Sequence, residues 1–158
     1  MASCYGWFVK QMELLGFAAS GMERDPLALQ VGEATYDLSP DRVEIGDCVE
    51  LLRATQNQVD VVSCFSLLHH FVLGRGSVGP EELVRLLDTV TGRILFMDTG
   101  QENEEWFMES LSGWSTEYIT VFLRQHTSFD RILDLGPDED AVGPYAANYR
   151  RHLFACVR

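Results

Sequence analysis

The run VDVVSCFS at residues 59–66 constrains the fold of this chain more than any other segment. It is an almost continuous series of β-branched and small residues, without the alternation expected of a strand that has one face in water. Such runs are typical of strands buried on both faces in parallel sheets. We therefore expect an α/β fold in which helices cover both faces of a sheet, as a three-layer sandwich.

Strand-like and helix-like segments alternate on both sides of this run. We predict strands at residues 17–23, 42–47, 59–66, 92–98, 129–136 and 151–158. We predict helices at residues 7–16, from Pro26 to about 33, and at 48–54, 80–90, 102–112 and 115–126. The sheet should be mostly parallel, with the last two strands forming an antiparallel pair at one edge. In the first helix, one stripe holds Trp7, Phe8, Met12 and Leu15, and Gly16 ends it.

Length and charge limit the classes of function. The 158 residues, 46% of them hydrophobic, suit one globular domain spanning 1–158, because no linker-like segment divides them. The formal net charge of −12 repels phosphate backbones, so we expect no nucleic-acid partner. The acidic run ENEE at 102–105 is expected to be solvated.

Targeting and metal signals are weak in this sequence. It has no signal peptide and no apolar run of about 18 residues, which predicts a soluble, cytoplasmic protein without a membrane partner. The four cysteines (Cys4, Cys48, Cys64 and Cys156) are scattered without a C-x-x-C pair, and we expect no metal site. Cys64 and Cys156 lie in apolar segments, where a free cysteine behaves as a small hydrophobic residue.

The chemistry of an open α/β sheet is expected just after each strand, at the carboxyl ends. Glu23 follows the first predicted strand and can accept hydrogen bonds from the two hydroxyls of a ribose. The alternative is an acid that stabilises a helix N-terminus, a role that suits Asp25 better. Asp47 follows the next strand and can accept from the amine of an adenine, or cap the helix that begins at Cys48.

Two adjacent histidines and an aspartate follow the later strands. His69 and His70 suggest a general base, but neighbouring side chains on a helix diverge, which argues against a shared metal ion. The alternative is that one histidine packs and forms hydrogen bonds while the other faces the cleft. Asp98 ends the strand at 92–98 and is either a cleft carboxylate or a turn residue.

Taken together and in order, GMERDP, IGDC, VDVVSCFSLLHHF and GRILFMDTG resemble the class I S-adenosylmethionine-dependent methyltransferases. The resemblance covers about residues 4–158, including the two final strands. It implies a Rossmann-like methyltransferase sheet. The first strand of that sheet is missing or very short in this sequence, so we expect a chain truncated at the N-terminus within the glycine-rich loop. A longer coding sequence upstream would then carry the strand.

The resemblance also implies roles for particular residues. Glu23 matches the acid that binds the cofactor ribose, and Asp47 the carboxylate at the adenine amine, with Cys48 beside the ring. Phe65 and Ser66 match residues that border the methionine end and the substrate. In the same way, Tyr5 and Gly6 match the end of the glycine-rich loop.

The function implied is methyl transfer from S-adenosylmethionine to a small-molecule acceptor, complete only in a longer chain if the truncation is real. His69 or His70 would be the base for a hydroxyl acceptor, and Asp98 the second candidate. An alternative is a non-catalytic methyltransferase-like fragment that acts as an interaction module. A nicotinamide-dependent enzyme is a third reading, disfavoured because GxGxxG is absent. Open sheet edges also allow a homo-oligomer in which a neighbour's strand fills the gap.

Overall fold

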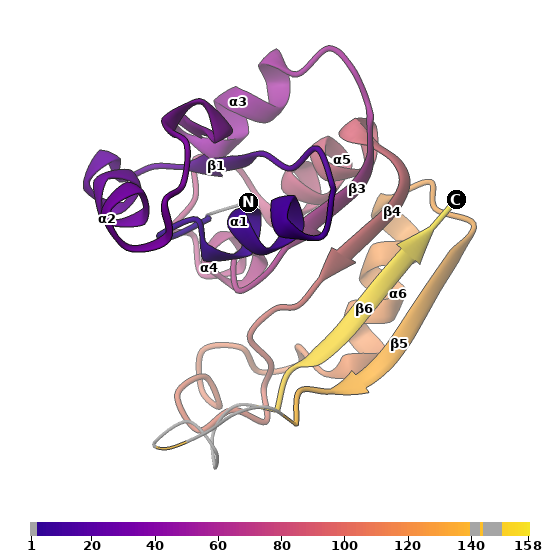
Figure 1. Ribbon diagram of the computed structural model, residues 1–158. Coiled ribbons are helices and arrows are strands. Elements are labelled where there is room, and N and C mark those ends of the chain that lie inside the picture. The colour runs from indigo at the N-terminus through magenta and orange to yellow at the C-terminus, as the bar shows by residue number, and fades with distance from the viewer. Residues whose placement is uncertain (1–2, 140–142, 144–149) are drawn as a thin grey trace. The chain divides into compact units, whose positions relative to one another are not determined.

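The computed structural model describes residues 3–139, 143 and 150–158 (Figure 1). The chain divides into two compact units, one ending at Ala54 and the other running from Thr55 to Arg158. Within the described residues, the strands form two sheets, β1-β2 in the first unit and β3-β4-β6-β5 in the second. The structure is therefore mixed α/β, with parallel and antiparallel pairs. The prediction of one domain over 1–158 stays a prediction.

The first unit is built around a short parallel pair of strands. Its elements are α1 (Trp7–Leu14), β1 (Gly21–Glu23), α2 (Pro26–Tyr36), the 3₁₀ helix η1 (Pro40–Arg42), β2 (Val43–Ile45) and α3 (Cys48–Ala54). The predicted helix at 48–54 and the start of α2 at Pro26 are confirmed, because proline fits the first turn of a helix. The two strands are shorter than predicted, at three residues each.

A different face of α1 is buried from the one that the sequence suggested. Val9 is 5% exposed and packs with Leu38 and Val43. Trp7 is 53% exposed and Leu15 70% exposed, so the predicted stripe does not form the core of this unit. Large apolar residues lie on both sides of this helix, and hydrophobicity alone does not choose between them. The predicted end at Gly16 is confirmed by its φ of 89° and by a bond from its N–H to the Glu13 carbonyl.

A tight turn precedes α1 and packs against β1 and α2. The Ser3 N–H donates to the Met22 carbonyl at 2.9 Å, and the Gly6 N–H donates to the Ser3 carbonyl at 2.8 Å. Gly6 has a φ of 73°, a left-handed conformation that favours glycine. On α2, a side chain at Gly32 would overlap the carbonyl oxygen of Tyr5. Glycine at this helical position therefore lets the backbone of the turn approach α2.

The second unit holds a four-stranded mixed sheet. Its elements are β3 (Val59–Cys64), α4 (Leu68–Val72), α5 (Pro80–Val90), β4 (Thr91–Met97), α6 (Thr116–His126), β5 (Arg131–Pro137) and β6 (His152–Val157). The order is β3-β4-β6-β5, with β3 parallel to β4 and β6 antiparallel to both of its neighbours. The predicted antiparallel pair of final strands is confirmed, with β5 at the sheet edge (Figure 1).

Helices α5 and α6 contact each other, and they pack on β3, β4 and β5. The amphipathic pattern of α5 explains its place, because its buried residues (Leu83, Val84, Leu87 and Val90) recur at helical spacing. From the sheet, Cys64, Leu95, Phe154 and Cys156 are fully buried. The burial of Cys64 and Cys156 agrees with the prediction that they behave as small hydrophobic residues, and it raises the pKa of the Cys156 thiol to about 12.

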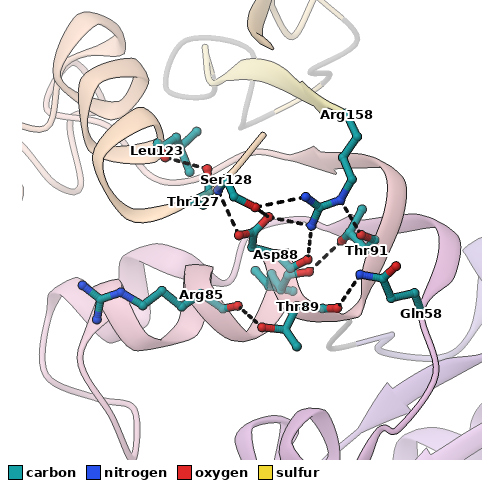
Figure 2. Close-up of polar contacts among 10 residues, drawn as sticks. Gln58, Arg85, Asp88, Thr89, Thr91, Leu123, Thr127, Ser128 and Arg158 are labelled. Carbon is teal, nitrogen blue, oxygen red and sulfur yellow. Dashed lines mark hydrogen bonds and ion pairs between the residues drawn. The ribbon is translucent and has the colours of Figure 1, made fainter. Parts of the chain in front are cut away.

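Arg158 joins the end of β6 to the C-terminus of α5 and to the start of β5 (Figure 2). Its guanidinium donates to the carbonyls of Thr91 at 2.9 Å and Asp88 at 2.6 Å, and to the Asp88 carboxylate at 2.8 Å. It also donates to the Ser128 hydroxyl and lies 4.9 Å from the ring of Phe129. Carbonyls at the end of a helix lack helical partners, so this side chain caps α5.

The helix predicted at 102–112 is not formed. The segment folds instead as consecutive turns, with N–H to carbonyl bonds from Phe107 to Glu104 and from Trp114 to Leu111. Glu104 is 1% exposed and Leu111 is fully buried, so both side chains are held by the interior of the unit. The expectation that ENEE is fully solvated is wrong for Glu104, whose ion pair is described below. Tertiary contacts override helix propensity here.

Two negative findings apply to the part of the chain that the structure describes. None of its helices is long and apolar enough to cross a membrane. None of its groups of His, Cys, Asp and Glu side chains is arranged so that three or more of them could hold a metal ion.

The packing of Gly32 against Tyr5 makes a stability prediction. Gly32→Ala adds a methyl group where a backbone carbonyl already lies, so it should lower the free energy of unfolding by roughly 1–3 kcal/mol. At a solvent-exposed helix position, Gly→Ala would instead raise the free energy of unfolding by up to about 1 kcal/mol. The sign of the change therefore shows whether Gly32 is packed against a backbone. Urea unfolding measures the change. Thr35→Ala, at an exposed position of the same helix, should stay within about 0.5 kcal/mol of wild type. A stabilising Gly32→Ala would contradict the packing described.

Candidate functional site

Glu23 stands at the carboxyl end of β1, as predicted, and its carboxylate accepts three backbone N–H groups. Its Oε1 accepts from Arg24 at 2.8 Å and Asp25 at 3.1 Å, and its Oε2 accepts from Cys4 at 2.7 Å. A carboxylate offers about four acceptor positions, so about one position, on Oε2, remains for a ligand hydroxyl. The sequence predicted bonds to both hydroxyls of a ribose. The bond from Cys4 takes one of the two positions on Oε2 that this would use.

An aspartate caps the helix that follows each of the two strands of the first unit. Asp25, not Glu23, is the N-cap of α2, and it accepts from the Leu27 N–H at 2.9 Å. Asp47 accepts from the Val49 N–H at 2.9 Å, so it caps α3 as the sequence allowed. A ligand role for Asp47 would be additional to this capping. Cys48 is half-buried beside it, and burial together with the Asp47 charge raises the pKa of its thiol.

Tyr5 and Gly6, predicted to end a cofactor loop, belong to the tight turn before α1. Tyr5 is 47% exposed, and Gly6 is buried. Within the first unit this turn is tied directly to the Glu23 carboxylate through Cys4, whose φ is 52°. The turn that holds Tyr5 and Gly6 therefore lies next to the Glu23 carboxylate, and the role of these residues in a cofactor site stays a prediction.

In the second unit, the segments after β3 and β4 meet because these strands are parallel neighbours. Cys64 is paired with Met97 at their carboxyl ends. Ser66 follows β3 with a φ of 53°, and its N–H donates to the Asp98 carboxylate. Phe65 and Ser66 are half-buried. Burial raises the pKa of Asp98, although the Ser66 N–H opposes this effect.

His69 is buried, and its ring accepts a hydrogen bond from the backbone. It is 4% exposed, and its Nδ1 accepts from the Gly100 N–H at 3.1 Å, which places the proton of the neutral ring on Nε2. Its ring lies 5.0 Å from the ring of Phe107. Burial lowers the pKa of His69 to about 3, and the positive charge of Arg151 acts in the same direction. A base with this pKa is weak at neutral pH.

His70 differs from its neighbour on the same helix. It is only partly buried, and its ring lies 4.3 Å from that of His69. Burial lowers its pKa, and the charges of Arg75 and Arg151 add to the effect, so the ring is neutral at pH 7. A neutral imidazole is the form that accepts a proton. Of the two predicted bases, His70 is therefore the better placed.

Sequence reasoning missed a buried ion pair next to these residues. Arg151, 4% exposed, donates to both oxygens of Glu104, at 2.9 Å and 3.0 Å. It also donates to the Ser66 hydroxyl at 2.8 Å, and it lies 5.9 Å from the ring of Phe107. Glu104 additionally accepts the Gln101 N–H at 2.8 Å. The signal for Arg151 in the sequence was an arginine directly before an apolar strand, which does not identify its partner.

One further buried group next to Asp98 lacks a partner. The Thr99 hydroxyl is fully buried and has no hydrogen-bond partner among the described residues. Gly100 follows it, and a side chain there would press on the rings of Phe107 and His69. The segment 98–100 is thus packed against α4 and the turns after β4.

Comparisons with known proteins bear on the fold. No family model and no curated protein matches the sequence. Among solved structures, the bifunctional kinase-methyltransferase WbdD is similar over 99% of this chain, with a TM-score of 0.73 and 16% identity. The chain spans 33% of that WbdD chain, about a third of its length.

Two further solved structures show the same likeness. A SAM-dependent methyltransferase from Archaeoglobus fulgidus matches 99% of this chain and 83% of its own, with a TM-score of 0.67 and 11% identity. An O-methyltransferase family protein from Burkholderia thailandensis matches 99% of this chain and 49% of its own, with a TM-score of 0.63 and 17% identity. At these identities the likeness establishes a methyltransferase-like fold.

The buried ion pair predicts an asymmetric mutational pattern. Arg151→Met leaves the Glu104 carboxylate charged and unpaired in the interior, so we expect a loss of about 3–5 kcal/mol in unfolding free energy. The double variant Arg151→Met, Glu104→Leu removes both charges and should recover most of that loss. Urea unfolding of the two variants measures the difference. Equal losses in the single and double variants would show that the pair is not buried as described.

His69 predicts a pH dependence of stability. Its pKa is about 3 when folded and about 6.5 when unfolded, so the unfolded chain binds the extra proton between these values. The contribution of His69 is complete above pH 6.5 and is lost as the pH falls towards 3. His69→Asn keeps an acceptor for Gly100 but cannot titrate, so its stability should fall less steeply, by up to about 1.4 kcal/mol per pH unit. Urea unfolding from pH 7 to 4 gives the free energy of unfolding of both proteins at each pH. If it falls equally steeply with pH in wild type and in His69→Asn, the assignment is refuted.

Proposed function

We propose that this chain is the catalytic domain, or part of it, of an S-adenosylmethionine-dependent methyltransferase that acts on a small molecule. The observation that carries the proposal is the likeness of 99% of the chain to solved structures named as methyltransferases. The motifs GMERDP, IGDC and VDVVSCFSLLHHF support it, because their polar residues lie just after β1, β2 and β3. The sheet would be of the Rossmann-like methyltransferase type, with three layers, and the first strand and the truncation stay predictions.

The residues present fit the cofactor by the chemistry of their donors and acceptors. Glu23 keeps about one acceptor position, which suits a ribose hydroxyl. Asp47 would accept from the adenine amine with Cys48 beside the ring, and Tyr5 and Gly6 would border the same ligand. Phe65 and Ser66 would border its methionine end. Tyr5, Gly6, Glu23, Asp47 and Cys48 belong to the first unit, and Phe65 and Ser66 belong to the second.

The bound cofactor would supply an electrophilic methyl group, which leaves as the acceptor displaces it in line. The chain itself then has to align the acceptor and to hold its proton. His70 is the proposed base for a hydroxyl acceptor, because its ring is neutral at pH 7 and only partly buried. Asp98 is the second candidate, because its raised pKa makes it a better proton acceptor than an ordinary carboxylate. In this scheme His69 holds Gly100 in place.

The acceptor class follows from charge. A net charge of −12 opposes the approach of a nucleic acid, so a small neutral or cationic molecule is the expected acceptor. A cytoplasmic location and a second copy of the chain as a partner remain predictions from the sequence.

Calorimetric titration with S-adenosylmethionine tests the proposal. We expect saturable binding by the wild-type chain. Glu23→Gln should weaken it about tenfold or more, because a charged acceptor for a ribose hydroxyl is lost. Glu33→Gln makes the same change at an exposed position of α2 and should bind like wild type.

The outcomes separate the proposed enzyme from the interaction module. Absence of binding by the folded wild-type chain would refute a complete cofactor site and favour a non-catalytic module. Equal weakening by Glu23→Gln and Glu33→Gln would remove Glu23 from the site. Transfer of a labelled methyl group to a panel of hydroxylated small molecules then identifies the acceptor.

A further inference from the structure

The buried pair Arg151–Glu104 is not used by the proposed chemistry, yet it lies among the residues that are. Arg151 stands directly before β6, and Glu104 lies in the turns that follow β4. Both side chains are almost completely buried, at 4% and 1% exposure. Burying two charges is expensive, and an apolar pair of similar size often serves stability equally well. Stability therefore does not explain why charged residues occupy these positions.

The contacts of Arg151 converge on the carboxyl ends of β3 and β4. The Nε and Nη2 groups of Arg151 donate to the two carboxylate oxygens of Glu104, and Nη1 donates to the Ser66 hydroxyl at 2.8 Å. The Ser66 N–H in turn donates to Asp98. A single side chain thus connects the segment after β3 with the segment after β4. The planar, five-donor guanidinium allows this, whereas the ammonium group of lysine cannot keep the two-pronged contact.

The ring of Phe107 extends the same connection to α4. It lies 5.9 Å from the Arg151 guanidinium and 5.0 Å from the His69 ring. His69 holds the Gly100 N–H, and its ring lies 4.3 Å from that of His70. Arg151 is therefore connected to His70, the proposed base, through the rings of Phe107 and His69.

We propose that Arg151, acting through Glu104, Ser66 and Phe107, is a positioning residue of the methyl-transfer site. It fixes the segments after β3 and β4 on which Ser66, Asp98 and the α4 histidines depend. This inference rests on the proposed function, which supplies the reaction being served.

Electrostatics support the geometry. The Arg151 charge lowers the pKa of both His69 and His70, after the larger effect of burial. The other cation acting on His70 is Arg75, at the end of the α4 region, and it acts in the same direction. Removing Arg151 should raise the pKa of His70 towards the ordinary value of histidine. An ion pair at the far end of β6, such as Arg158 with Asp88, should leave this titration unchanged.

The opposite end of β6 supplies a matched control. Arg158 also pairs with a carboxylate, Asp88, and donates to a serine hydroxyl (Figure 2). It also lies against a phenylalanine ring. Asp88, like Glu104, also accepts a backbone N–H. Because β6 is antiparallel to β4, Arg158 lies at the end of β4 away from Asp98. The control pair therefore shares the chemistry of Arg151 and Glu104 but not their place.

The experiment compares four versions of the 158-residue chain: wild type, Arg151→Met with Glu104→Leu, Arg151→Lys, and Arg158→Met with Asp88→Leu. Proton NMR of the histidine rings gives the His70 titration midpoint, and hydrogen exchange gives the protection of the Ser66 and Gly100 amides. Titration with S-adenosylmethionine is run on the same samples. Neither the NMR titration nor the hydrogen-exchange measurement needs a methyl acceptor.

The expected result is specific to the Arg151 end. The Arg151→Met, Glu104→Leu protein should show a higher His70 midpoint and about tenfold faster exchange at Ser66, while the Arg158 and Asp88 double variant leaves both unchanged. Arg151→Lys keeps the charge, so it should keep the midpoint but speed the exchange, and it serves if the double variant does not fold.

The inference is overturned if the Arg151 variants leave the His70 midpoint and the Ser66 exchange as they are in wild type, or if the control moves them equally. If wild type fails to bind S-adenosylmethionine, the proposed function falls. The NMR and exchange results still decide whether Arg151 positions these segments.

Discussion

The second unit depends on one buried interaction, the pairing of Arg151 with Glu104. Each charge is stable in the interior only because the other is present with good geometry, and the two-pronged contact supplies that geometry. The pair connects residues 47 positions apart in sequence. It thereby fixes the path of the turns after β4, and through Ser66 it fixes the segment after β3.

The strand β6 carries an arginine at each end, and the two perform different tasks with the same chemistry. Arg158 closes the C-terminus of α5, where helix carbonyls lack partners (Figure 2). Arg151 lies where the parallel strands β3 and β4 end, which is the end at which α/β folds place their ligands. Both arginines pair with a carboxylate and donate to a serine hydroxyl, and Arg158 donates in addition to two backbone carbonyls. The difference in role follows from position along the strand.

Local patterns were enough to predict most elements of the fold. Pro26 and Pro80 begin α2 and α5, and the β-branched run at 59–66 contains β3. The prediction of a helix at 102–112 was wrong. The conformation of this segment is set by Arg151, the distant partner of Glu104, which no local pattern reveals. In the same way, Arg151 could not be found as a site neighbour, because its partners depend on the sheet order that brings β6 beside β4.

The site residues show the same limit at shorter range. Sequence placed Glu23 and Asp25 near one strand end and favoured Asp25 for the helix N-terminus. The structure confirms the cap at Asp25 and shows that Glu23 keeps about one acceptor position. His69 and His70 are also adjacent, and their side chains diverge on α4, so one packs and the other stays partly exposed. In the first pair, Asp25 caps α2, while Glu23 accepts three other backbone N–H groups and keeps about one acceptor position. In the second pair, His69 accepts from the Gly100 N–H. A motif therefore predicts which strand ends carry polar residues, while the hydrogen bonds of the folded chain determine which of those residues keeps an acceptor position or an exposed ring.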